Sequence, residues 1–114
     1  MTKLTLSVLL FLFGQTLIWF QTNGQFIWPW FQKHPIFLSI VGGSTISYAF
    51  IIATRYAFEH FDGLLWPGRF LGFALGISSY ALLTWIFMGE GISLKTFTSL
   101  ILSAGIICVQ LFWK

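Results

Sequence analysis

Few side chains in this sequence have the chemistry to act as acids, bases, nucleophiles or metal ligands. Its 114 residues include six Lys and Arg, three Asp and Glu, two His and one Cys. Glu59, His60 and Asp62 lie close together, but their spacing matches no ligand pattern for a metal ion. The single cysteine, Cys108, excludes an internal disulfide. Because the sequence also presents no nucleophile with an adjacent base, we expect no catalytic residue, no metal site, no cofactor and no enzyme activity.

Neutral polar and aromatic residues within the apolar stretches are better candidates for contacts with a ligand. Gln15 and Trp19 are four residues apart and therefore share one face of a helix. With Thr16, Tyr48 and Tyr80 they would line a polar, aromatic cavity at mid-depth of a helical bundle, so these five residues are our substrate-cavity candidates. The same side chains are equally able to form interhelical hydrogen bonds that hold a bundle together. The sequence leaves both interpretations open.

Two charged residues beside the apolar stretches are candidates for gate or orientation charges. Arg55 lies near the end of the second stretch, and Glu90 lies between Gly89 and Gly91 after the third. The alternative for Arg55 is that its side chain extends to the lipid phosphates, as is common near helix ends. The alternative for Glu90 is a solvated carboxylate in a turn. Arg69, at the start of the third stretch, has the same two interpretations as Arg55.

The elements that carry these residues follow from the composition. Charged residues make up 8% of the chain and hydrophobic residues 57%, whereas soluble domains contain about 25% charged residues, and the mean hydropathy is +0.86. Because a helix needs about 20 apolar residues to cross a bilayer, we predict an all-α membrane protein with a four-transmembrane-helix bundle as a single domain, residues 1–114. The predicted helices cover residues 4–20, 35–57, 68–88 and 94–113.

The segments between these helices have distinct characters. Residues 21–34 contain four aromatic side chains around Pro29, and aromatic residues at this density beside helix ends are typical of the headgroup level of a membrane. We therefore predict an interfacial aromatic loop there. Gly89 is expected to end the third helix, and Ser93 is expected to cap the start of the fourth.

The positions of the cations predict an orientation. Short connections make neighbouring helices antiparallel, so both termini are expected on one side of the membrane. Four cations lie on that side and two on the other, which favours both termini in the cytoplasm and a place in the inner or plasma membrane; two orientations in one membrane remain compatible with this difference. The four cations on the side of the termini are Lys3, Arg55, Arg69 and Lys114, and the two on the other side are Lys33 and Lys95.

No run of Lys or Arg in the sequence suits binding to nucleic acid, so nucleic acid is not expected as a partner.

Small residues predict the surfaces at which helices pack closely. Apolar side chains gain nothing by leaving lipid, so helices associate where small residues let their backbones approach. The third stretch has a glycine at every fourth position, for which we favour contacts within the four-helix unit over contacts between protomers. Comparable groups lie in the second and fourth stretches. The groups are Gly68, Gly72 and Gly76 in the third stretch, Gly42, Gly43, Ser44 and Ser47 in the second, and Ser99, Ser103 and Gly105 in the fourth.

The C-terminal half resembles a known pattern. Residues 87–95, with the Gly-Glu pair, and 99–106, which contain Ala-Gly, resemble the closing helix pair of the drug/metabolite transporter superfamily, which includes the small multidrug resistance proteins. Ser99 replaces the first glycine of the last helix in that pattern. The remainder resembles a small four-helix family placed in the same superfamily, and this resemblance implies a small multidrug resistance-like bundle. The residues that carry the second resemblance are Thr16, Trp19 and Phe20, and Ala53, Thr54 and Arg55.

Two features depart from that pattern. Small multidrug resistance pumps depend on a membrane-embedded glutamate in the first helix, whereas the corresponding candidates here are Gly14, Gln15 and Thr16, none of which can carry a proton. Proton-coupled drug export by that mechanism is therefore not expected. The aromatic segment 21–34 is also longer than such proteins usually have, which would suit a docking surface.

Two hypotheses for the function follow. The first is a transporter of a small polar or cationic metabolite in the lipid bilayer, acting as a homodimer because four helices enclose too little volume for a substrate path. In the second, the protein is a non-transporting structural or accessory subunit of a larger membrane complex, and the small-residue faces and the aromatic loop contact its partners.

Overall fold

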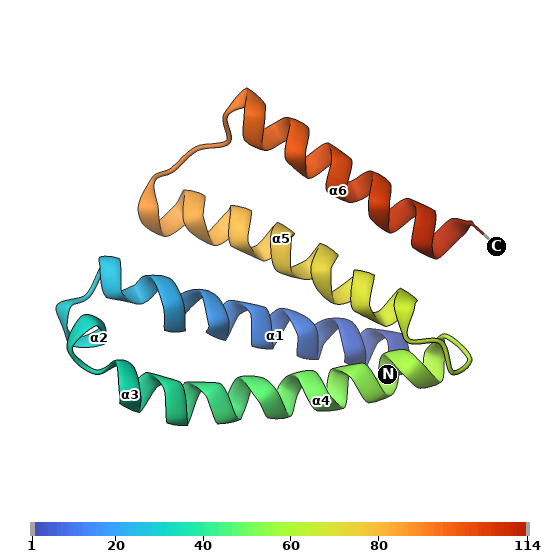
Figure 1. The fold of residues 1–114 in the computed structure, drawn as a ribbon, viewed down its shortest axis with the longest axis horizontal. Helices are drawn as coiled ribbons and strands as arrows, with labels where there is room; N and C mark the ends of the chain where they lie inside the picture. Colours follow the sequence, from blue (N-terminus) through green and yellow to red (C-terminus); the bar gives the residue numbers. More distant parts are fainter. Residues whose placement is uncertain (1, 114) are drawn as a thin grey trace.

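The computed structural model describes residues 2–113, in which helices and turns are present and strands are not (Figure 1). Four helical stretches are long and apolar enough to cross a membrane: residues 3–26, residues 35–60, α5 and α6. The prediction of an all-helical chain with four such helices is confirmed, and it is compatible with an integral membrane protein. The elements in chain order are α1 (Lys3–Asn23), η1 (Gly24–Phe26), α2 (Pro29–Lys33), α3 (Pro35–Phe37), η2 (Leu38–Gly42), α4 (Gly43–His60), α5 (Trp66–Met88) and α6 (Leu94–Phe112).

Local signals fix the boundaries around the last connection. Gly89 adopts a left-handed backbone with φ of 69° and ends α5, a conformation that glycine reaches without steric cost. The Ser93 side chain accepts a hydrogen bond from the Thr96 backbone amide at 3.2 Å and caps α6. Both predictions are confirmed, because these signals act within one turn of the chain.

The first helix extends beyond its predicted end at residue 20. Polar residues continue it to Asn23 because their side chains find partners: Gln21 Nε2 donates to the Leu38 carbonyl at 2.9 Å, and Thr22 Oγ1 donates to the Ile18 carbonyl at 2.8 Å. Leu38 belongs to the π-helical turn η2, where the wider helix alters the usual backbone pairing. The Gln21 side chain therefore joins the C-terminal end of α1 to the start of the next long helix.

The aromatic segment 21–34 is largely helical. Its short helices η1 and α2 turn the chain back toward α3 (Figure 1). The Trp28 ring lies 6.1 Å from the Phe20 ring and 6.5 Å from the Phe87 ring between centroids, so the segment packs over the ends of α1 and α5. Gly24 is buried beneath Phe31, where a Cβ atom would lie 2.5 Å from that ring. The segment is thus a folded cap on one end of the helices.

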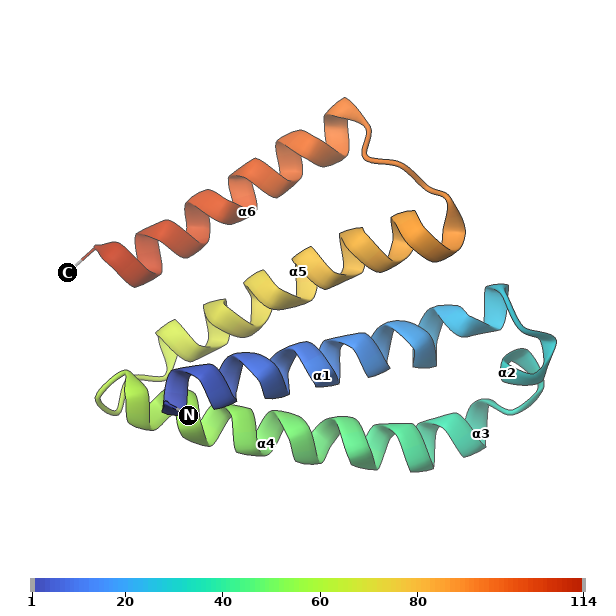
Figure 2. The same ribbon diagram turned by 180° about the vertical axis from the view of Figure 1, so that it is seen from behind.

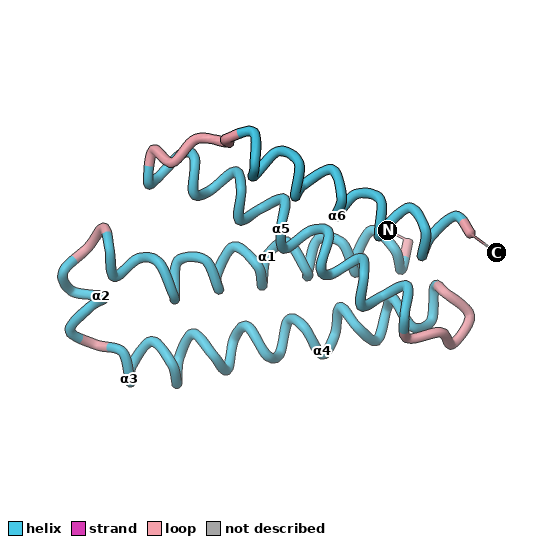
Figure 3. Tube along the Cα trace, turned by 45° about the horizontal axis from the view of Figure 1, so that its top comes forward, coloured by secondary structure: helices cyan, strands magenta, loops and turns pink. Residues whose placement is uncertain are grey.

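The long helices alternate in direction, and α1 lies between α4 and α5 (Figures 1 and 2). Helix α6 packs on α5 on the side away from α4, and a second view shows α5 running obliquely across α1 (Figure 3). The start of α1 and the end of α6 lie at the same end of the molecule, as predicted (Figure 1). Lys114, one of the cations used to predict the orientation, lies outside the described residues.

The buried core lies between α1 and α4. Ala49, Ala53 and Ala57 are 3%, 0% and 0% exposed, at the four-residue spacing of one helix face, and Phe11 of α1 packs with the last two. The expected packing face of the second apolar stretch is observed only in part: Ser44 and Ser47 are exposed, whereas a Cβ atom at Gly42 would lie 3.3 Å from Gln21 Nε2 of α1. The alanines form the packing face of α4 against α1, because a methyl group permits close approach and brings no hydroxyl that needs a hydrogen-bond partner.

Candidate functional site

Polar residues of α1 bond to the two neighbouring helices. Gln15 Nε2 donates to the Gly72 carbonyl at 3.3 Å, and Trp19 Nε1 donates to Thr84 Oγ1 at 3.0 Å, so both predicted cavity residues face α5. On the other side, the buried Ser7 hydroxyl donates to the Ala53 carbonyl of α4 at 2.8 Å. For Gln15 and Trp19, the alternative of interhelical hydrogen bonding is therefore the one observed.

The glycine stripe of α5 contacts helices of the same chain. A Cβ atom would lie 3.1 Å from Ala57 Cβ at Gly68, 3.2 Å from the Phe11 ring at Gly72, and 2.8 Å from the Gln15 carboxamide at Gly76. Each glycine therefore makes room for a specific side chain of α1 or α4. The favoured interpretation, contacts within the four-helix unit, agrees with this packing.

The five substrate-cavity candidates do not form one cavity. Tyr48 is 69% exposed on α4 and Tyr80 is 50% exposed on α5, whereas Trp19 is 1% exposed between helices. Thr16 is partly buried on α1. Each tyrosine directly adjoins a buried small residue, Ala49 or Ser79, and adjacent positions on a helix point in different directions. The burial of those neighbours turns Tyr48 and Tyr80 outward, so these two residues do not meet Gln15 and Trp19 within one chain.

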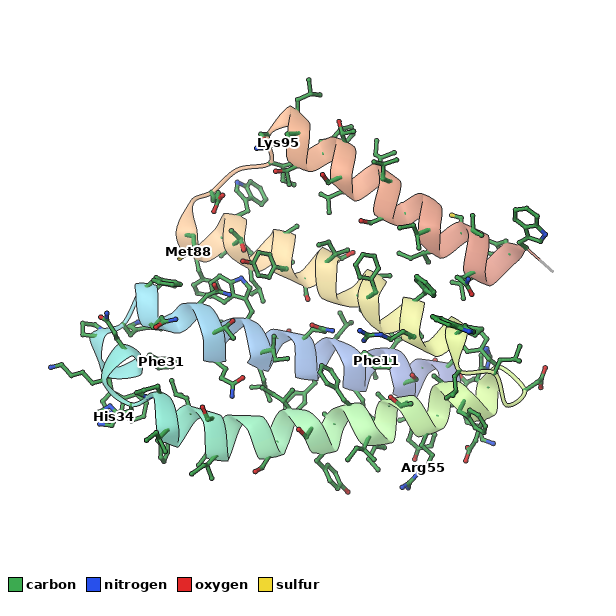
Figure 4. The ribbon with its side chains drawn as sticks, viewed as in Figure 1. Phe11, Phe31, His34, Arg55, Met88 and Lys95 are labelled. Carbon is green, nitrogen blue, oxygen red and sulfur yellow. The ribbon has the colours of Figure 1, made fainter. Side chains whose placement is uncertain are left out.

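Tyr80 instead lies with Glu90 in a pocket of about 260 Å³ between α5 and α6. The Thr84 and Thr96 side chains also line it, so the pocket combines one carboxylate, one phenol and two hydroxyls on an apolar wall. It adjoins the α5–α6 connection, whose flanking residues Met88 and Lys95 are labelled in Figure 4. This pocket, which we call the Glu90 pocket, brings together two predicted site residues from separate groups.

A second pocket of about 300 Å³ lies among α1, α4 and α5 and is called the Arg69 pocket here. Its wall includes Phe11, Phe50 and Leu65, together with the polar residues Thr54 and Arg69 and the predicted cavity residue Gln15. From the sequence, Arg69 has the same two interpretations as Arg55: a functional charge, or an arginine that extends to the lipid phosphates. No pattern along the chain links it to Phe11 or Phe50, because these residues meet only when the three helices pack.

The small residues of α6 have a different role from those of α5. The Ser99 hydroxyl donates to the Lys95 carbonyl at 3.0 Å and the Ser103 hydroxyl to the Ser99 carbonyl at 2.9 Å, both within α6. A Cβ atom at Gly105 would meet no described atom within 4 Å. Ser103 lines an apolar groove between α5 and α6. A packing role for Ser99 and Gly105 would therefore require another chain.

The remaining charged candidates lie at the helix ends. Arg55 projects from α4 away from the other helices (Figure 4) and is exposed. At the same end, Lys3 Nζ and Glu59 Oε2 are 3.3 Å apart. Within residues 2–113, no group of three or more His, Cys, Asp or Glu side chains is placed to hold a metal ion.

Comparison of the chain with protein-family models, with curated proteins and with solved structures gives no match. The assignment of function therefore depends on the two pockets and on the packing around them.

Proposed function

We propose that this protein is a small transporter, related to the drug/metabolite transporter superfamily, that moves a small polar or cationic metabolite across a membrane as a homodimer. The observation that carries the proposal is the Glu90 pocket, in which a carboxylate and an aromatic ring line one cavity. The resemblance of residues 87–95 and 99–106 to the closing helix pair of that superfamily gives independent support.

The chemistry of the Glu90 pocket favours a cation. Its described lining contains Glu90 and no basic residue, so a positively charged ligand would neutralise the carboxylate. The face of the Tyr80 ring would attract the same charge, while the Thr84 and Thr96 hydroxyls offer hydrogen bonds to a polar ligand. The volume of about 260 Å³ is near the lower limit of small-molecule pockets, which favours a small metabolite.

The packing of α6 favours a dimer. This helix has no buried residue among those described, and the described lining of the Glu90 pocket comes from α5, α6 and their connection. A second copy would cover the open side of the pocket and raise the number of helices around a substrate path from four to eight. In this arrangement Glu90 lies beside the path as an orientation charge. Arg55 remains a candidate gate charge at the opposite end of the helices.

Transport can be tested by flux into proteoliposomes with guanidinium, a quaternary ammonium ion and a polyamine as probes. Glu90 is exposed in the single chain. We expect saturable uptake of at least one probe and a loss of about tenfold in Glu90→Gln, since loss of a charge-assisted contact costs about 1.5 kcal/mol. Asp62→Asn is the matched control, because it removes a carboxylate from the α4–α5 connection. Uptake equal to that of empty liposomes for all three probes, or equal losses in the two variants, would contradict the proposal.

The orientation and the oligomer are part of the same proposal. We place both termini in the cytoplasm, because Lys3, Arg55 and Arg69 share one end while Lys33 and Lys95 lie in or after the opposite connections. A reporter fused to the C-terminus of the full chain measures this orientation. Native mass spectrometry in mild detergent should give the mass of two chains, and a single-chain mass at all concentrations would contradict the dimer.

A second candidate function is an accessory subunit of a larger membrane complex. The observation that favours it is the aromatic patch at the cap, in which Trp28 and Trp30 are exposed and Phe20 and Phe31 partly buried. In addition, α6 has no buried residue among those described. Co-purification of one unrelated membrane protein in fixed proportion, lost in Trp30→Ala and retained in Trp113→Ala, would favour this function over transport.

A further inference from the structure

We propose that the Arg69 pocket binds an anionic phospholipid, with the lipid phosphate on Arg69 and the start of an acyl chain against Phe11 and Phe50. The inference does not rest on the proposed transport function, because this pocket lies among α1, α4 and α5 and shares no lining residue with the Glu90 pocket.

The charge of Arg69 has no counterpart among the described residues. Its side chain forms no ion pair or hydrogen bond with residues 2–113, and the described lining of the pocket includes no carboxylate. Arg69 also lies in the first turn of α5, which contains no acidic residue, and the start of a helix carries partial positive charge that disfavours a cation. A bound anion would relieve both sources of unfavourable charge.

The remaining wall indicates that the anion belongs to an amphiphile. Phe11, Phe50 and Leu65 present apolar surface beside the guanidinium, which suits an acyl chain. The Gln15 side chain also lines the pocket, but its Nε2 already donates to the Gly72 carbonyl. The Thr54 hydroxyl forms no hydrogen bond with the described residues and is available to donate to a phosphate oxygen. Arginine and hydroxyl donors together are common partners of phosphate groups.

The position of the pocket suits a lipid of the surrounding bilayer. If α5 crosses the membrane, its first turn lies near the headgroup level, and the Phe11 side of the pocket extends toward the hydrocarbon region. The volume of about 300 Å³ accommodates only part of a lipid, so the rest of the molecule would continue along the helices. The proposed occupant is therefore an anionic phospholipid, in which the negative charge of the phosphate is not balanced by a cationic headgroup.

Arg55 provides a matched control for the charge. It lies at the same end of the helices, is exposed like Arg69 and forms no ion pair with a described residue, but it projects away from the helices (Figure 4). The full chain would be reconstituted in nanodiscs of phosphatidylcholine with phosphatidylglycerol, and the phosphatidylglycerol retained after transfer to detergent would be counted by native mass spectrometry. We expect Arg69→Gln to lower retention about tenfold, as loss of a charge-assisted contact does, and Arg55→Gln to leave it within about twofold. Equal losses in the two variants would overturn the proposal, because they would indicate nonspecific attraction of lipid to surface cations.

A second variant tests the pocket without removing the charge. Thr54→Phe places a ring at the exposed Thr54 position and should also lower retention, while Arg69→Lys should preserve part of it. Inorganic phosphate and glycerophosphate, added as competitors, should displace less lipid than a short-chain phosphatidylglycerol does. Retention unchanged in Thr54→Phe, or equal displacement by glycerophosphate, would overturn the assignment to a lipid.

Discussion

In the unit formed by α1, α4 and α5, several small and polar residues contact neighbouring helices, whereas the serines predicted to pack in α6 bond within their own helix. Gly76 makes room for Gln15 of α1, and Ser7 bonds to α4. In α6, Ser99 and Ser103 bond to the preceding turn, and a Cβ atom at Gly105 would meet no described atom of another helix within 4 Å. The same residue types thus form contacts in one region and leave a free face in the other.

This difference shows which contacts give such an apolar chain a specific fold. Lipid-like surroundings give apolar side chains no reason to associate, so close packing and interhelical hydrogen bonds provide the specificity. Helix α1 supplies both kinds of contact to its two neighbours. Since α6 supplies neither to a comparable extent, we expect it to be the helix most open to a second chain.

The largest expected effect comes from filling the glycine stripe. Gly76→Val would place its Cβ about 2.8 Å from the Gln15 carboxamide, so that side chain has to move and lose its hydrogen bond to the Gly72 carbonyl. Overpacking together with this loss costs about 1–3 kcal/mol. Gly105→Val is the control in α6, where a Cβ meets no described atom within 4 Å. Thermal unfolding in detergent should show a clear loss of stability for the first variant and little change for the second. Equal stability of the two variants would remove the distinction between the regions.

An intermediate effect is expected from the buried tryptophan. Trp19→Phe removes the hydrogen bond to Thr84 Oγ1 and part of a ring that is 1% exposed, for a combined loss of about 1–2 kcal/mol. Trp113→Phe is the control, because Trp113 follows α6 and is 78% exposed. The free energy of unfolding measured by denaturant titration distinguishes the two. Thr84→Val should reproduce only the hydrogen-bond part, and a loss in Thr84→Val as large as that in Trp19→Phe would contradict this division.

The smallest effect is expected at the end of α1. Gln21→Ala removes the hydrogen bond to the Leu38 carbonyl at 2.9 Å, which should lower the free energy of unfolding by about 0.6–1 kcal/mol. Gln110→Ala in α6 is the control, since Gln110 makes no hydrogen bond with the described residues. If both variants unfold at the same denaturant concentration, the Gln21 contact contributes nothing to stability.

The sequence predicted those features whose causes are local. Gly89 ends α5 and Ser93 caps α6 through contacts within a single turn. The four membrane-length helices follow from runs of apolar residues, and the four-residue spacing of Gly68, Gly72 and Gly76 identified a packing face before its partners were known. The candidate site was predicted less well, because the grouping of Gln15, Trp19, Tyr48 and Tyr80 required the rotation of each helix about its axis.

Composition and spacing by themselves determined the number of long helices, their alternating directions and the face shared by Gln15 and Trp19. Tertiary structure alone decided that this face bonds to α5, that Tyr48 points outward, and that Tyr80 meets Glu90 while Arg69 lies beside Phe11. The physical reason is that hydrophobic surface and helix caps act along one segment. The rotation of a helix depends instead on which small residue of its neighbour makes room for which large side chain, as Gly72 does for Phe11.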